Sequence, residues 1–146
     1  MKIKIKRLDS SLPLPRYETG GSVGFDLVTR EDTAVAANSF ALVPGNVVVQ
    51  LPPGYALLVA SRSSTPRRTG LVAPHGIGIV DSDYCGPEDE VMVQVWNPTA
   101  EAVTVKRGDR IAQGVIVNTV QAQWEEVDEL DAPSRGGFGS TGQSSG

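Results

Sequence analysis

The sequence contains few of the residues that build disulfides and metal sites. Among its 146 residues there is one cysteine, Cys85, and one histidine, His75. A single thiol has no partner for an internal disulfide, and one cysteine with one histidine cannot supply the ligands of a structural zinc site. The scarcity of cysteine favours a reduced, cytoplasmic setting.

Long apolar runs and an excess of positive charge are also missing. The first ten residues, MKIKIKRLDS, do not contain the apolar core of a signal peptide, and no segment predicts a membrane span. With 13 Lys and Arg against 17 Asp and Glu, the formal net charge is −4. This balance argues against the broad basic surface that DNA or RNA binding needs, so any phosphate binding must be local.

The length predicts one domain, and the apolar pattern predicts that it is all-β. No long window has the 3.6-residue period of an amphipathic helix, whereas the first segment, Lys2–Leu8, alternates Lys with Ile as an edge strand with one buried face would. A helical turn is expected only at Ser64–Thr69, where Pro66 interrupts it. The other strand-like runs, rich in Val and Ile, are Phe40–Leu51, Tyr55–Ala60, Ile77–Val80, Val91–Trp96 and Ile111–Val117. This pattern predicts a sandwich or barrel of short strands.

The composition changes after Trp124. Five acidic residues follow up to Asp131, and then a Gly/Ser tail with too few apolar side chains to fold on a core of its own. We therefore expect a β-domain over residues 1–124 and an acidic linker with a flexible arm over residues 125–146.

The residues best suited to chemistry lie in Gly76–Glu90, GIGIVDSDYCGPEDE. The glycines leave main-chain groups uncovered, where a flat polar ring such as a pyrimidine could pair. Asp81 could orient a water, and Tyr84 offers an aromatic face that could pack on a sugar. The alternative interpretation is an ordinary β-hairpin with an acidic tip, since Asp, Ser and Gly are common turn residues.

Four other segments accompany this one: GSVGFDL (21–27), SRSSTPRRTG (61–70), RGDRIAQ (107–113) and SRGGFGSTG (134–142). With GIGIVDSDY as the third of five, they resemble the motifs of the homotrimeric dUTP pyrophosphatases (dUTPases), in one order and over nearly the whole chain. Together they are far more specific than any single motif. The resemblance implies a jelly-roll-like fold, a homotrimer with sites at subunit interfaces, and Mg²⁺ as cofactor.

The implied reaction converts dUTP and water to dUMP and pyrophosphate. Asp81 should orient and deprotonate the water that attacks the α-phosphorus in line. For selectivity, the main chain of Gly78, Ile79 and Val80 would pair with uracil, and Tyr84 would occupy the space of a 2′-hydroxyl. A tight hairpin would reject the methyl group of thymine.

Two departures from the family lie around this motif. His75, counted among the substrate-binding residues, stands where many family members have asparagine, and Cys85–Glu88 replaces a shorter turn. Both could alter the hairpin geometry, and neither removes Asp81 or Tyr84.

The second motif would contact the phosphate chain through Arg62, Ser63 and Ser64. A guanidinium, hydroxyls and amides before a helical turn can converge on phosphate oxygens, although a serine read by itself fits a helix N-cap better. Arg67 and Arg68 are expected to be solvated charge.

Two residues complete the predicted phosphate and metal side. Asp26 is either a structural carboxylate or an acid near the metal, and the resemblance implies that it lies close to Mg²⁺, through water and without an all-protein cage. Gln113 would be an amide donor toward phosphate or a satisfied strand residue. Arg110 fits a structural ion pair and a ligand contact equally.

The tail would close over the site by becoming ordered as ligand binds, although a loose end is commoner in an arbitrary protein. The resemblance implies that Phe138 stacks on uracil, that Gly139, Ser140 and Thr141 hold phosphate, and that Arg135 meets the terminal phosphates. The family pattern RGxGGFG has two more residues between arginine and phenylalanine, and their loss removes up to about 7 Å of reach.

Two alternatives stay open. A dCTP deaminase has a related trimeric fold and an RSS segment, but DSDYCGPEDE matches the hydrolase. A non-catalytic nucleotide-binding trimer would have no need of Asp81.

Overall fold

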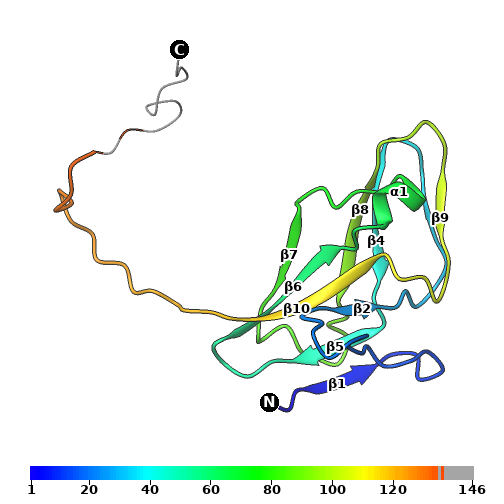
Figure 1. Cartoon of the computed structure of the whole chain (residues 1–146), viewed down its shortest axis with the longest axis horizontal. Helices are drawn as coiled ribbons and strands as arrows, with labels where there is room; N and C mark the ends of the chain where they lie inside the picture. The colour runs from blue at the N-terminus through cyan, green and yellow to red at the C-terminus, as the bar shows by residue number, and fades with distance from the viewer. Residues whose placement is uncertain (135, 137–146) are drawn as a thin grey trace.

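The computed structural model describes residues 1–134 and Gly136, and most of them form the β-rich body in Figure 1. All of its ladders are antiparallel. The predicted all-β class is confirmed, and the architecture is jelly-roll-like. The elements in chain order are β1 (Lys4–Arg7), β2 (Phe25–Leu27), β3 (Thr33–Val35), β4 (Ser39–Pro44), β5 (Val47–Gln50), β6 (Tyr55–Ser61), α1 (Thr65–Thr69), β7 (Ile77–Val80), β8 (Met92–Asn97), β9 (Val103–Val105) and β10 (Ala112–Asn118).

These strands form four sheets. The largest has the order β2-β10-β6-β7, and the pairs β1-β5, β3-β9 and β4-β8 form the others. The first four motifs lie on or next to the strands of the largest sheet, so this sheet positions the candidate site.

The core lies between the sheets and consists of aliphatic side chains together with one aromatic ring, that of Phe25, among the described residues. Along β8, exposed and buried residues alternate, which places one face of the strand in the core. Branched side chains suit such half-buried strands, and each full burial contributes roughly 1.5–3 kcal/mol. The largest fully buried apolar side chains are Leu27, Val35, Val43, Val47, Leu57, Leu71, Val91 and Val105.

The apolar run at 40–51 divides into β4 and β5. Gly45 and Asn46 turn the chain between them, and Asn46 has a positive φ of 66°. A Cβ on Gly45 would lie 2.6 Å from the carbonyl oxygen of Val91, so this close approach requires glycine. The strands β2, β3 and β9, of three residues each, are too short to show a period in the sequence.

Two local predictions need correction. Pro66 lies in the first turn of α1, which begins at Thr65, and does not interrupt the helix, because proline at the first helical positions removes only an amide that has no helical partner. The edge position of β1 is confirmed, and its buried face is confirmed only in part: Ile3 packs against the core, whereas Ile5 is 38% exposed, because β1 lies outside β5, its one partner in the described part of the chain.

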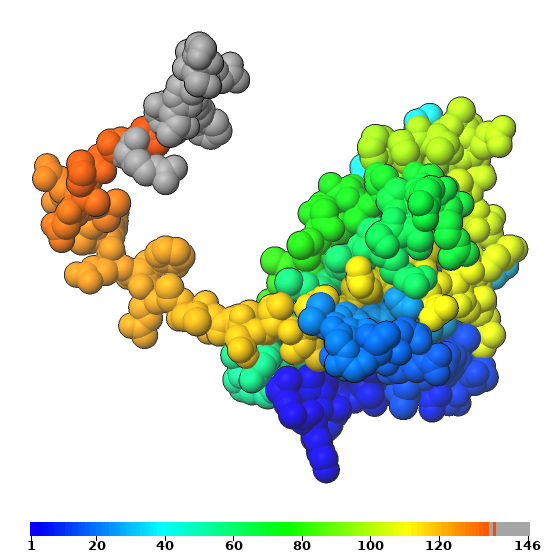
Figure 2. Space-filling view, in the orientation of Figure 1, coloured from blue at the N-terminus to red at the C-terminus, as the bar shows by residue number. Residues whose placement is uncertain are grey.

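The chain leaves the body after β10, which ends at Asn118. Figure 2 shows the following segment extending clear of the other described residues. Val120 and Trp124 in this segment are 94% and 95% exposed. Within the described ranges, no helix is long and apolar enough to cross a membrane.

Candidate active site

The predicted site residues within the described ranges fall into two groups on the four-stranded sheet. The first group comes from three adjacent strands. Asp26 on β2 lies opposite Gln113 on β10, and Gln113 lies opposite Ala60, at the end of β6 that leads into Arg62. The sheet therefore brings the first, second and fourth motifs together.

Ion pairs hold this first group. Asp26 Oδ1 lies 2.8 Å from Arg62 Nε, and Arg62 Nη1 donates a hydrogen bond of 3.1 Å to the carbonyl of Arg110. The Asp26 side chain is 14% exposed, whereas those of Arg62 and Arg110 are 27% and 44% exposed. Because a guanidinium has five N–H donors, both arginines keep donors for a ligand at the surface.

The second oxygen of Asp26 is buried and has no hydrogen-bond partner in the described structure. Arg110 Nη1 lies 3.1 Å from it, close enough for an ion pair but outside hydrogen-bond geometry. Such an oxygen could accept a hydrogen bond from water on Mg²⁺, which keeps several waters when substrate phosphates bind it. The described residues contain no cluster of three or more His, Cys, Asp or Glu side chains that could hold a metal ion.

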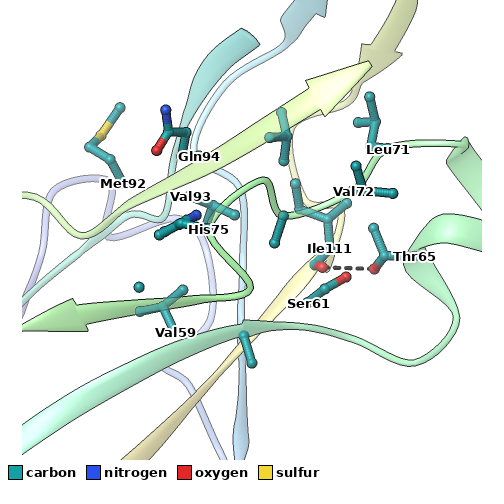
Figure 3. A pocket seen from close by; sticks show the side chains of 14 residues that line it. Val59, Ser61, Thr65, Leu71, Val72, His75, Met92, Val93, Gln94 and Ile111 are labelled. Carbon is teal, nitrogen blue, oxygen red and sulfur yellow. Dashed lines mark hydrogen bonds between the residues drawn. The ribbon is translucent and has the colours of Figure 1, made fainter. Parts of the chain in front are cut away.

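The serines of the second motif follow β6 directly. Ser64 occupies the N-cap position of α1, as the alternative interpretation has it, but its side chain makes no capping hydrogen bond within the described structure. The loop is instead tied to β10, because Thr65 Oγ1 donates a 2.7 Å hydrogen bond to the carbonyl of Ile111 (Figure 3).

The amide of Gln113 is partly engaged. Its Nε2 donates a 3.3 Å hydrogen bond to the carbonyl of Ser61. An amide nitrogen carries two N–H donors, so one is left over and both readings of Gln113 survive. Arg67 and Arg68 are exposed, as expected for solvated charge.

The second group lies on β7 and the loop after it. Tyr84 is 42% exposed and Asp81 is exposed as well. The predicted hairpin is wrong, both as a site and as the ordinary alternative, because β7 pairs with β6 and β8 pairs with β4. The segment between Val80 and Met92 is a loop that joins two sheets.

Strand β7 lies at the edge of its sheet, where main-chain groups are open on one side. Ile77 and Ile79 are 51% and 70% exposed. A flat ring could thus pair with the main chain of Gly78, Ile79 and Val80, as the sequence predicts. His75 is exposed and borders, with Gly78 and Ser61, a cavity of about 40 Å³ (Figure 3).

The two groups are far apart within one chain. Val80 lies opposite Leu57 on β6, so the next residue, Asp81, is level with Ala56. Arg62 is six residues further along the chain, which is about 20 Å at ~3.3 Å per strand residue. A single chain therefore cannot direct Asp81 and Arg62 at the same phosphate.

Some residues near the site leave no local pattern in the sequence. Glu18 lies 3.1 Å from Arg110, and Arg30 pairs with Glu90 behind the loop of Tyr84. Partners so distant along the chain become visible only in the fold. Five predicted residues, Arg135, Phe138, Gly139, Ser140 and Thr141, lie outside the described residues.

Comparisons with known proteins agree with the motifs. The family model described as dUTPase matches residues 10–142. A deoxyuridine 5'-triphosphate nucleotidohydrolase of Hahella chejuensis is 43% identical, over 97% of this chain and 95% of the relative. The Thermobifida fusca protein of the same name is 44% identical, over 97% of this chain and 79% of the relative.

Solved structures give the same result. A dUTPase from Streptococcus mutans has a TM-score of 0.75 and 30% identity, over 82% of this chain and 98% of that one. The dUTPase of Staphylococcus bacteriophage 80alpha, solved with dUPNHPP, has a TM-score of 0.85 at 23% identity and supports the fold. With a family model over most of its length and relatives above 40% identity, the chain belongs to the dUTPase family.

Proposed function

We propose that this chain hydrolyses dUTP to dUMP and pyrophosphate in a homotrimer whose active sites lie between subunits. Family membership supports the reaction. The observation that carries the assembly is the separation of Asp81 from Arg62 and Asp26 along the sheet. One subunit supplies the base and the edge of β7, and a second supplies the phosphate residues.

Symmetry makes this arrangement repeat. If the surface around Asp81 meets the surface around Arg62 of the next copy, three copies close a ring with three equal sites. The exposed Val120 and Trp124 suit a segment that crosses to a neighbour, where its apolar side chains are covered. Phe40 and Trp96 stack at 6.1 Å on another uncovered face and also suit an assembly.

The residues have separate roles. Asp81 orients the attacking water and takes its proton, and the protein otherwise positions the triphosphate. Arg62, Ser63, Ser64 and Gln113 bind phosphate oxygens, and Asp26 accepts a hydrogen bond from a metal-bound water. Mg²⁺, when bound, would neutralise the triphosphate and the leaving pyrophosphate.

The proposal also assigns a role to the C-terminal arm and a cellular compartment to the enzyme. The arm over residues 125–146 closes over the site, with Phe138 on uracil and with Arg135, Gly139, Ser140 and Thr141 at the phosphates. The enzyme acts in the cytoplasm on a free nucleotide, without nucleic-acid or membrane partners. The single free cysteine and the acidic composition support this setting.

An assay of pyrophosphate release across the deoxynucleoside triphosphates, with Mg²⁺, tests the reaction. Release from dUTP alone is the expected result. Ammonia from dCTP would reveal a deaminase, and tight dUTP binding without turnover would reveal a sensor. The family findings do not favour either alternative.

Complementation tests the shared site. Asp81→Asn and Arg62→Met chains should each be nearly inactive alone. Co-refolded in equal amounts, random trimers should place an intact Asp81 beside an intact Arg62 at about a quarter of the sites. No recovery in mixed trimers would mean that each chain builds its site alone.

A further inference from the structure

An ion pair between a partly exposed arginine, Arg30, and a buried glutamate, Glu90, anchors the far end of the loop that carries Asp81 and Tyr84. The side chain of Glu90 is 9% exposed. Arg30 donates to it from Nε at 3.0 Å and from Nη2 at 3.0 Å, and the main-chain N–H of Asn46 donates at 2.8 Å. Arg30 Nε also donates to the second carboxylate oxygen at 3.2 Å, so the loop ends on a residue held by four hydrogen bonds from two other segments.

Tyr84 is attached to this anchor. Its hydroxyl donates a 3.2 Å hydrogen bond to the main-chain carbonyl of Glu90. Because the tyrosine is 42% exposed, much of the ring still faces outward, where a ligand could contact it. The position of the ring thus depends on the position of the Glu90 backbone.

The backbone on either side of this bond is held to different degrees. After Glu90, Val91 exchanges main-chain hydrogen bonds with the β4-β5 segment, at 2.8 Å to Val47 and 2.9 Å from Gly45. Before Glu90, the loop is contacted by the N-terminal strand at Pro87, whose carbonyl accepts a 2.8 Å hydrogen bond from Lys6 Nζ. The ion pair lies between these two regions.

The Arg30–Glu90 ion pair is costly to separate. Its carboxylate is buried, and separating it from the guanidinium would leave an unpaired charge away from water. The hydrogen bonds from Arg30 to Glu90 also raise the pKa of the Arg30 guanidinium above its usual value. The guanidinium of Arg30 thus stays charged around neutral pH, at hydrogen-bond distance from the Glu90 side chain.

We propose that Arg30 and Glu90 are positioning residues for sugar selectivity, which hold the Tyr84 ring where a 2′-hydroxyl would clash. Steric rejection of UTP requires that the Tyr84 ring stays in place, because a ring that moves aside makes room for the 2′-hydroxyl. The inference rests on the proposed hydrolysis of dUTP and on the expectation from the sequence that Tyr84 packs against the sugar of the substrate.

The test compares kcat/KM for dUTP and for UTP in the full-length enzyme. Glu90→Gln and Arg30→Met should each lower the preference for dUTP by about tenfold. Loss of folded protein lowers both rates in the same proportion and leaves their ratio unchanged, so the ratio separates positioning from stability. Glu31→Gln is the matched control, since Glu31 contacts the same guanidinium at 3.3 Å from an exposed position.

Two further variants test the route through Tyr84. Tyr84→Phe removes only the hydroxyl of a half-exposed residue, so it should fold normally and still lose part of the preference for dUTP. The double variant Tyr84→Ala with Glu90→Gln should have the same ratio of kcat/KM for dUTP and UTP as Tyr84→Ala alone. An unchanged ratio in Tyr84→Phe, or a further fall in the double variant, would overturn the proposal.

The outcomes separate this inference from the proposed function. If the parent enzyme does not hydrolyse dUTP, both fail. If it hydrolyses dUTP but accepts UTP equally, the proposed function stands and only the positioning role falls. If the parent prefers dUTP and folded Glu90→Gln and Arg30→Met enzymes keep that preference, the proposed function stands and the positioning role falls.

Discussion

Arg62 Nε lies 2.8 Å from Asp26 Oδ1, which joins a predicted phosphate ligand to the residue predicted to lie near the metal. The carboxylate fixes the direction of the guanidinium before any substrate arrives. Such pre-organisation lowers the entropy that binding would otherwise cost. The two residues therefore act as one unit.

Asp26→Asn should raise the Mg²⁺ concentration that gives the half-maximal rate by about 10–100-fold, since an amide is a poorer acceptor for metal-bound water. A Mg²⁺ titration of dUTP hydrolysis measures this. Asp32→Asn, at an exposed ion pair with Lys106, is the control and should leave the titration unchanged. An unchanged midpoint in Asp26→Asn would make Asp26 a purely structural partner of Arg62.

Asp81→Asn should fold and bind dUTP but lose turnover by about a hundredfold or more, because the amide cannot accept the proton of water. Steady-state kinetics and binding of a non-hydrolysable analogue measure the two properties. Asp83→Asn, in the same loop, is the matched control. Near-normal turnover by Asp81→Asn would assign the base to another group.

Tyr84→Ala should accept UTP about tenfold better relative to dUTP, because the ring no longer fills the space beside C2′. The ratio of kcat/KM values for the two substrates measures the effect. Tyr17→Ala removes another half-exposed tyrosine and should leave the ratio unchanged. Continued rejection of UTP by Tyr84→Ala would place the discrimination in another contact.

Truncation before Ser134 should leave a folded trimer with turnover reduced at least about tenfold, since closure over the substrate excludes water and orients it. Thermal stability should barely change, because the last strand ends at Asn118. Turnover equal to that of the intact chain would make the arm a passive tail. Arg135→Ala distinguishes two cases. A large loss of turnover would mean that the guanidinium reaches the phosphates despite the short spacing to Phe138, and a small loss would mean that another cation binds them.

Asp9→Asn should lose stability in a pH-dependent way. Hydrogen bonds from Ser11 and then Arg107 hold the pKa of Asp9 well below its usual range. Because the pKa of Asp9 is lower in the folded than in the unfolded protein, its ionisation stabilises the fold. This stabilisation is fully present above the unfolded pKa of about 3.9 and is lost as the pH falls through the folded pKa. The variant should therefore melt below the parent at pH 7, and the difference should shrink from pH 5 toward pH 2. A difference that stays constant over this range would contradict the assignment.

The fold class and the motif residues could be read from the sequence because both depend on neighbours along the chain. Alternating Val and Ile with turn residues predicts strands whatever they later pair with. The glycines before Asp81, and the spacing to Tyr84, are likewise local. The three-residue strands and the turn at Gly45 were not predicted from the sequence, since each contains too few residues to show a periodic pattern.

Only the tertiary structure decided which residues meet. Pairing of β7 with β6, rather than with β8, opened an edge of the sheet and placed Asp81 and Arg62 at opposite ends of one strand. It also brought Arg30 to Glu90 behind Tyr84. Strand pairing and ion pairs between distant segments arise from burial of the whole core, and no window of the sequence contains both partners.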